Sequence, residues 1–244
     1  NLGAINALVS AGDAIFEDKL NHASLLDGGL LSRANFKRFR HKDCNHLNDQ
    51  LGQISASDGR KLIVTDGVFS MDGDLCDIDA LCKIGTEHKA WLMVDDAHGF
   101  GVLGEEGRGV VNPAIHSSDD VQVLVGTLGK AFGTQGAFIA GSEELIETLI
   151  QGARTFIYTT ALPAAVAVAT TESLRIVRTE HWRREKLQAL IAQFREGAQA
   201  LGLDLLPSTT PIQPVLMDSE ANALQVAQQL EDQGILVTAI RPPT

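Results

Sequence analysis

Short apolar runs alternate with stretches of helical periodicity along most of this chain. Residues 62–65 and 91–94 are β-branched or apolar runs, and residues 77–87 between them repeat apolar side chains every three or four positions. Strands buried on both faces lack the polar alternation of half-exposed strands, and a helix between two such strands is typical of a parallel βαβ unit. The pattern therefore predicts an α/β fold with helices packed on a mostly parallel sheet.

The same reasoning extends to the rest of the chain. After Pro163 the sequence becomes rich in long helical segments, which predicts a large domain over residues 1–175 and an incomplete α+β domain over 176–244. The predicted strands cover residues 14–16, 36–39, 62–65, 91–94, 121–125, 137–140, 212–217 and 235–238. The predicted helices cover residues 2–9, a segment beginning near His22, and residues 47–54, 77–87, 164–178, 184–201 and 221–233.

Composition excludes several classes of protein. Hydrophobic residues make up 44% of the 244 residues and charged residues 21%, which is enough apolar surface to bury a core. The net charge of −11 argues against a nucleic acid or an anionic membrane as the main partner, because both require clustered positive charge. Three cysteines without CxxC spacing indicate a reducing, cytoplasmic compartment. The absence of an initiator Met predicts an internal segment of a longer protein.

Polar residues that could bind a ligand or take part in catalysis come directly after the ends of the predicted strands. Asp95 and His98 follow one strand, and Thr127 and Lys130 follow the next. Ligands of open α/β sheets bind beyond the carboxyl ends of the strands, so these side chains are the ones to consider first. Ser70 and His22 occupy comparable positions after two other strands.

This set of side chains matches the requirements of pyridoxal 5′-phosphate (PLP). A partly buried Lys130 can form a Schiff base with the aldehyde, and Asp95 can keep the pyridine nitrogen protonated. His98 can reach the ring hydroxyl, and Thr127 can bind the phosphate. Each residue alone has an ordinary alternative, as a surface lysine, a turn aspartate, a turn histidine or a loop threonine. Only their combination favours PLP.

Two other patterns carry less weight. Residues 99–104 match GxGxxG, but a dinucleotide site requires the motif to open a helix, and residues 105–109 continue with two carboxylates and two glycines. His41, Cys44 and His46 resemble metal ligands, but no fourth ligand follows at a suitable spacing, so no metal is predicted.

Five motifs in this order resemble the α-oxoamine synthase family, and the resemblance covers essentially the whole chain. The family consists of PLP enzymes of fold type I, like aspartate aminotransferase, with a three-layer α/β/α large domain, and it condenses an amino acid with an acyl thioester and releases CO2. The motifs are residues 21–24, 66–74, 92–99, 104–109 and 126–130.

The resemblance also implies a role for each candidate residue. Lys130 would hold PLP covalently and move protons, and Asp95 would bind the pyridinium nitrogen. His98 would bind the phenolic oxygen, with Ser70 beside it, and Thr127 would contact the phosphate. Three further residues would face the substrate: His22 stacked on the ring, with Arg241 and Thr244 near the substrate entrance.

Residues 97–99 and 238–244 most resemble the family member that acts in biotin biosynthesis. That resemblance implies condensation of L-alanine with pimeloyl-CoA or a pimeloyl-carrier protein to give 8-amino-7-oxononanoate, CO2 and free thiol, in a cytoplasmic homodimer. A Gly-aromatic pair and a carboxylate-binding arginine of the family would lie outside these residues, so the segment alone is expected to be inactive. The alternatives are a sister synthase such as glycine C-acetyltransferase, an aminotransferase, and a non-catalytic α/β binding domain.

Overall fold

The computed structural model describes residues 1–54 and 59–241, and the chain divides into two compact units. The first unit comprises residues 1–70 and 74–186, and the second comprises residues 71–73 and 187–244. The predicted candidate residues other than Arg241 and Thr244 all belong to the first unit. Among the described residues, none of the helices is both long and apolar enough to cross a membrane.

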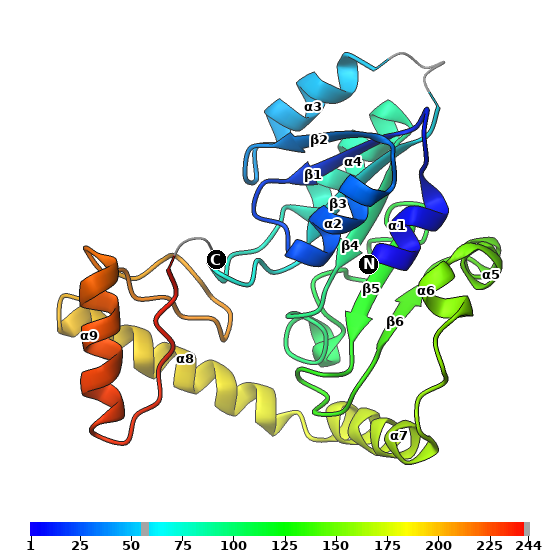
Figure 1. Cartoon of the computed structure of the whole chain (residues 1–244). Helices are drawn as coiled ribbons and strands as arrows, with labels where there is room; N and C mark the ends of the chain where they lie inside the picture. Colours follow the sequence, from blue (N-terminus) through cyan, green and yellow to red (C-terminus); the bar gives the residue numbers. More distant parts are fainter. Residues whose placement is uncertain (55–58, 242–244) are drawn as a thin grey trace. The chain divides into compact units, whose positions relative to one another are not determined.

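A six-stranded sheet forms the centre of the first unit (Figure 1). The strand order is β2-β1-β3-β4-β5-β6; the first five strands run parallel, and β6 pairs antiparallel with β5. Each strand overlaps a predicted range, so the predicted α/β fold is confirmed. The bounds are β1 (Ala14–Asp18), β2 (Asn35–Phe39), β3 (Lys61–Asp66), β4 (Trp91–Asp95), β5 (Val123–Thr127) and β6 (Ala137–Ala140).

Helices cover both faces of the sheet and make the predicted three layers. Along β3, Ile63 packs into one hydrophobic cluster while its neighbours Leu62 and Val64 pack into the other, because successive strand residues point to opposite faces. Each cluster includes residues of the helices on its own side. These helices are α3 (Cys44–Gly52) and α4 (Ile78–His88) on one face, and α1 (Leu2–Leu8), α2 (Ala23–Leu31) and α5 (Glu143–Gly152) on the other.

Side-chain caps fix where helices begin next to the sheet. The Asp77 carboxylate accepts the Ala80 N–H at 3.0 Å at the start of α4, an interaction worth about 1 kcal/mol. His22 precedes α2, and its ring nitrogen Nδ1 accepts the Ser24 N–H. The cap places His22 between the carboxyl end of β1 and the first turn of the helix.

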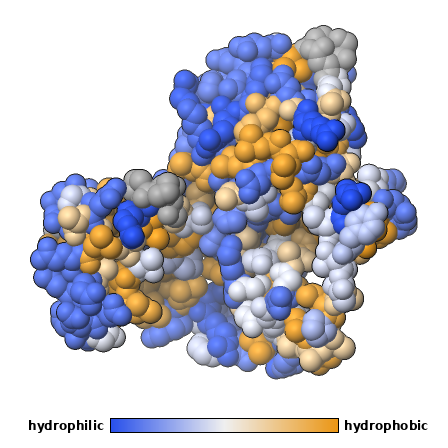
Figure 2. Space-filling model, in the orientation of Figure 1, coloured by the Kyte–Doolittle hydropathy of each residue, from blue (hydrophilic) through white to orange (hydrophobic). Residues whose placement is uncertain are grey.

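The rest of the first unit consists of loops and shorter helices. Residues 99–104 form turns, and only the 3₁₀ turn η1 (Glu105–Gly107) follows them, so this glycine-rich segment does not open an α-helix. Beyond the sheet lie α6 (Arg154–Ile157), α7 (Ala164–Thr179) and the first residues of α8 (Trp182–Ala200). Figure 2 shows hydrophobic side chains gathered over α2, where Leu30 and Leu31 are 64% and 61% exposed.

In the second unit, two predicted strands are wrong. Residues 212–217 contribute only an isolated bridge between Leu205 and Val215, because Pro214 lacks the N–H that a ladder requires. Residues 235–238 pair with no described strand, and Leu236 is 85% exposed. The predicted helices are confirmed as the later part of α8 and α9 (Glu220–Glu231).

Candidate active site

The candidate site lies at the carboxyl edge of the sheet, where β3, β4 and β5 end side by side. The pairing register places Asp66 at the end of β3 directly opposite Asp95 at the end of β4. Asp95 in turn pairs with Val125, two residues before Thr127. The parallel strands therefore bring the polar residues that follow them to one edge.

Asp95 is held by hydrogen bonds on both carboxylate oxygens. It is 5% exposed, and its Oδ1 accepts the Ala97 N–H at 3.0 Å. Its Oδ2 accepts a hydrogen bond from Asn1 Nδ2 at 2.6 Å, and the same amide group donates to Ser24 Oγ at 2.7 Å. Asn1 therefore links the end of β4 to the first turn of α2. Asn1 belongs to none of the five sequence motifs, so it was not predicted as a site residue.

Lys130 and His98 lie in direct contact, with 3.0 Å between Lys130 Nζ and His98 Nε2. Partial burial lowers the pKa of Lys130, while the carboxylates of Asp95 and Asp66 act in the opposite direction. Burial, together with the positive charge of Lys130, lowers the pKa of His98 to about 4. His98 is therefore neutral at neutral pH, and Nε2 can accept a hydrogen bond from the lysine amine.

A second carboxyl group, Asp66, faces this pair and was not among the predicted site residues. Burial raises its pKa to about 8, and the negative charge of Asp95 contributes further. Its Oδ2 accepts the His22 N–H at 2.6 Å, which fixes the backbone of His22 at the site. The His22 ring is exposed, and its charge is close enough to contribute to the lowered pKa of His98.

The remaining predicted residues differ in where they lie. Thr127 is half-buried; its hydroxyl donates to the Gly136 carbonyl and accepts the Gly129 N–H, both at 3.3 Å. Ser70 is half-buried in the turn after β3. Arg241 is exposed in the second unit, so its place near a substrate entrance stays a prediction, and Thr244 lies outside the described residues.

These residues fit PLP on the chemistry of the donors and acceptors present. Lys130 has a lowered pKa, as an amine that attacks an aldehyde requires. Asp95 is a buried carboxylate at the neighbouring strand end, and His98 is a neutral imidazole in contact with the amine. Together they offer a nucleophile, an anion for a pyridinium and a hydrogen-bonding ring within one cluster.

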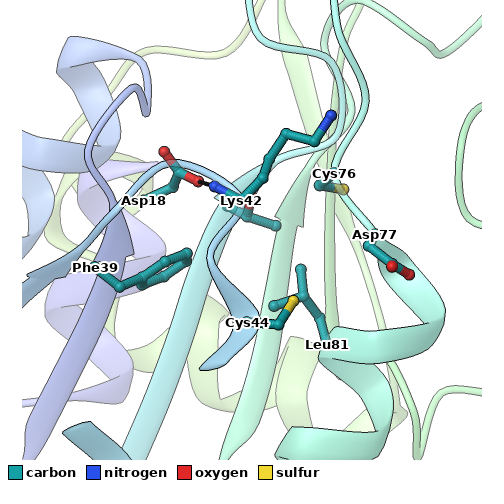
Figure 3. A pocket seen from close by; sticks show the side chains of 8 residues that line it. Asp18, Phe39, Lys42, Cys44, Cys76, Asp77 and Leu81 are labelled. Carbon is teal, nitrogen blue, oxygen red and sulfur yellow. Dashed lines mark hydrogen bonds between the residues drawn. The ribbon is translucent and has the colours of Figure 1, made fainter. Parts of the chain in front are cut away.

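A small cavity on the α3–α4 side of the sheet is a poor candidate for chemistry (Figure 3). Its volume of 10 Å³ is about what one water molecule needs. Burial raises the pKa of the Cys44 and Cys76 thiols, so both stay protonated and weakly nucleophilic at neutral pH. The lining residues are Asp18, Phe39, Lys42, Cys44, Thr65, Cys76, Asp77 and Leu81.

Comparison with known proteins assigns the family. The family model described as aminotransferase class I and II matches residues 1–244. This chain belongs to the aminotransferase class I and II family. The motifs predicted fold type I with PLP as the cofactor, and this family match confirms both.

Curated members of this family include close relatives of the chain. It is 62% identical to the 8-amino-7-oxononanoate synthase of Saccharophagus degradans and 61% identical to that of Nitrosococcus oceani, in each case over all 244 residues. The chain spans 61% and 64% of the length of these two proteins. The predicted resemblance to the α-oxoamine synthases is confirmed by these relatives.

Solved structures of the family have the same fold. The Sphingomonas wittichii serine palmitoyltransferase is 33% identical with a TM-score of 0.92, and the alignment covers 99% of this chain and 61% of that one. The 8-amino-7-oxononanoate synthase of Francisella tularensis is 37% identical with a TM-score of 0.86, covering 99% and 70%. Both likenesses extend over nearly all of the chain.

Proposed function

We propose that the protein containing this chain is a PLP-dependent acyltransferase that condenses L-alanine with a pimeloyl thioester. The products are 8-amino-7-oxononanoate, CO2 and a free thiol, a reaction of biotin biosynthesis. The observation that carries the proposal is the contact between Lys130 Nζ and His98 Nε2 beside Asp95. The relatives at about 60% identity, named 8-amino-7-oxononanoate synthase, supply the choice of substrates.

The bonds that change in this reaction balance without a further reactant. The alanine Cα loses its proton and forms a bond to the thioester carbonyl carbon, and the thiol leaves. The alanine carboxylate then leaves as CO2, and a proton replaces it at Cα. The chemistry that bound PLP supplies is a sink for the electron pair that remains on Cα after each of these losses.

The residues of the chain take separate roles around that chemistry. Asp95 would bind the protonated pyridine nitrogen, and Thr127 would contact the phosphate. Lys130 would hold the cofactor and, once released, move the proton to and from the alanine Cα. The lowered pKa of Lys130 favours the neutral amine that both tasks need.

Three other residues would complete the pocket around the ring. His98 would hydrogen-bond the phenolic oxygen, with Ser70 beside it. His22 would cover the face of the ring and exclude water, since the hydrogen bond from its N–H to Asp66 fixes its backbone there. Arg241 and Thr244 would lie near the substrate entrance.

The proposal includes the organisation of the protein. Residues 1–175 would carry the cofactor and residues 176–244 would belong to the small domain. A homodimer is supported by the exposed Leu30 and Leu31, since contiguous exposed apolar residues mark interaction surfaces. A cytoplasmic location is consistent with three free cysteines.

One experiment tests the cofactor assignment. The full-length protein is incubated with PLP, treated with borohydride, and digested for peptide mass spectrometry. We expect a pyridoxyl group on Lys130, and a protein that takes up no PLP would contradict the proposal and favour a non-catalytic binding domain.

A second experiment tests the substrates. Alanine, glycine and serine are each supplied with several acyl thioesters, and CO2 and thiol release are measured. Preference for alanine with a pimeloyl thioester is expected. Preference for another pair would identify a sister synthase, and turnover without CO2 would identify an aminotransferase-type reaction.

A further inference from the structure

The side chain of Asp96 is the most enclosed carboxylate next to the candidate site, and none of the roles above uses it. Asp96 is 1% exposed, and its Oδ2 accepts the Val110 N–H at 2.8 Å. Its Oδ1 has no hydrogen-bond partner within the described part of the chain. Burial raises the pKa of Asp96 to about 7.

Glycines from three loops surround this carboxylate. A Cβ atom on Gly99 would overlap Asp96 Oδ1, and one on Gly109 would overlap Oδ2. A Cβ on Gly67 would lie 3.0 Å from Oδ1. Gly109 also has a φ of +99°, which disfavours any other residue. One glycine from each of three sequence motifs, residues 66–74, 92–99 and 104–109, therefore approaches the same side chain.

The backbone of Asp96 controls the turn that carries His98. The Asp96 N–H donates to the Val125 carbonyl at 2.8 Å, which attaches the turn to β5. The Asp96 carbonyl accepts the Phe100 N–H at 3.0 Å, which closes the turn around His98. A movement of Asp96 would therefore move His98 relative to Lys130, the pair separated by 3.0 Å.

We propose that Asp96 is a positioning residue that holds His98 against Lys130 by packing its carboxylate between Gly67, Gly99 and Gly109. This inference rests on the proposed function, because its consequence is a correctly placed ring contact in the PLP site. Asp96 itself touches neither of the reacting side chains in this arrangement; it acts through the turn.

The test compares three substitutions of Asp96 in the full-length, PLP-loaded protein. Asp96→Asn keeps the size and an acceptor for the Val110 N–H, and we expect it to retain most of kcat. Asp96→Ala removes the packed carboxylate. Asp96→Glu makes the side chain too long for the space between the glycines. Each is expected to lower kcat at least ~10-fold, because displacement of a catalytic group by about 1 Å can cost up to ~100-fold.

A double-mutant cycle with His98→Asn separates positioning from general stability. If Asp96 acts through His98, Asp96→Ala lowers kcat much less in the His98→Asn background than in the wild type. An equal loss in both backgrounds would overturn the inference, as would wild-type activity of Asp96→Glu.

Asp13→Asn is the matched control. Asp13 is also nearly buried, and it accepts the Arg60 and Ser10 N–H groups at 2.8 and 2.9 Å just before β1, at the opposite edge of the sheet. The Asp13→Asn substitution should therefore reduce the melting temperature without changing kcat. Borohydride labelling of Lys130 in the wild type is measured in parallel. If Lys130 is not labelled, the proposed function is refuted. If Lys130 is labelled but Asp96→Ala has the kcat of the wild type, only the role of Asp96 is refuted.

Discussion

Glu17 gives the most direct test of the electrostatics of this fold. It lies on β1 with 0% exposure, and its only hydrogen bond to a described residue is from Asn21 Nδ2 to Oε2 at 3.3 Å. Burial raises its pKa to about 7, although the Asn21 hydrogen bond and the charge of Arg38 oppose the shift. The fold therefore binds a proton at Glu17 that the unfolded chain releases near pH 4.5.

The sign of the pH dependence follows from this difference. Between pH 4.5 and about pH 7 the folded state holds more protons than the unfolded state, so the free energy of unfolding falls as the pH rises. At 1.36 kcal/mol for each pKa unit, a difference of about 2.5 units corresponds to about 3 kcal/mol lost by pH 8. Glu17→Gln removes this term and keeps an oxygen that accepts from Asn21.

The assay is urea unfolding of the full-length protein and its Glu17→Gln variant at pH 5 and pH 8. We expect similar stability at pH 5 and a gain of about 2–3 kcal/mol for the variant at pH 8. Glu87→Gln, at an exposed position of α4, should show no such difference. Parallel pH dependences of the wild type and Glu17→Gln would refute the reasoning.

Three further substitutions test the site and the core. Lys130→Ala should abolish the visible absorbance of lysine-bound PLP, and a retained band would disprove the covalent role. Asp95→Asn should leave weak PLP binding but lower kcat by at least ~100-fold, because the substitution removes an electrostatic stabiliser. Turnover near the wild-type rate would argue against the proposed role of Asp95. Leu92→Ala, at a fully buried position of β4, should cost about 2–5 kcal/mol in urea unfolding, and a loss below 1 kcal/mol would show that the core collapses to fill the space.

Most of the first unit could be predicted because its strands are short apolar runs with clear ends. The helix α5 was missed although its start carries a recognisable signal: Ser142 accepts the Leu145 N–H, and Glu143 and Glu144 occupy the first turn. The strands predicted in the second unit failed for the opposite reason. β-branched composition favours a strand, but Pro214 removes a donor from one predicted strand, and the other, residues 235–238, has no described partner, which sequence periodicity does not reveal.

The candidate site was predictable only in part. Asp95, His98 and Lys130 stand at strand ends, and the parallel topology brings such residues together. Asn1 and Asp66 were missed because their importance comes from contacts between distant segments: 94 residues separate Asn1 from Asp95. The shifts in pKa likewise depend on burial and neighbouring charge, which a motif does not record.

The register between β3 and β4 has a consequence for how this sequence can evolve. Asp95 and Asp96 are adjacent and chemically identical, yet the carboxylate of Asp95 binds the Asn1 amide group whereas that of Asp96 is enclosed by glycines. Each side chain of a strand has its own surroundings, so deleting a single residue within β4 would move Asp96 into the place of Asp95 and Asp95 into the buried place of Val94. The two adjacent aspartates would survive such a deletion, but one carboxylate would be buried in the core and Ala97 would occupy the place between the glycines. Insertions and deletions should therefore be rarer in this strand than substitutions are.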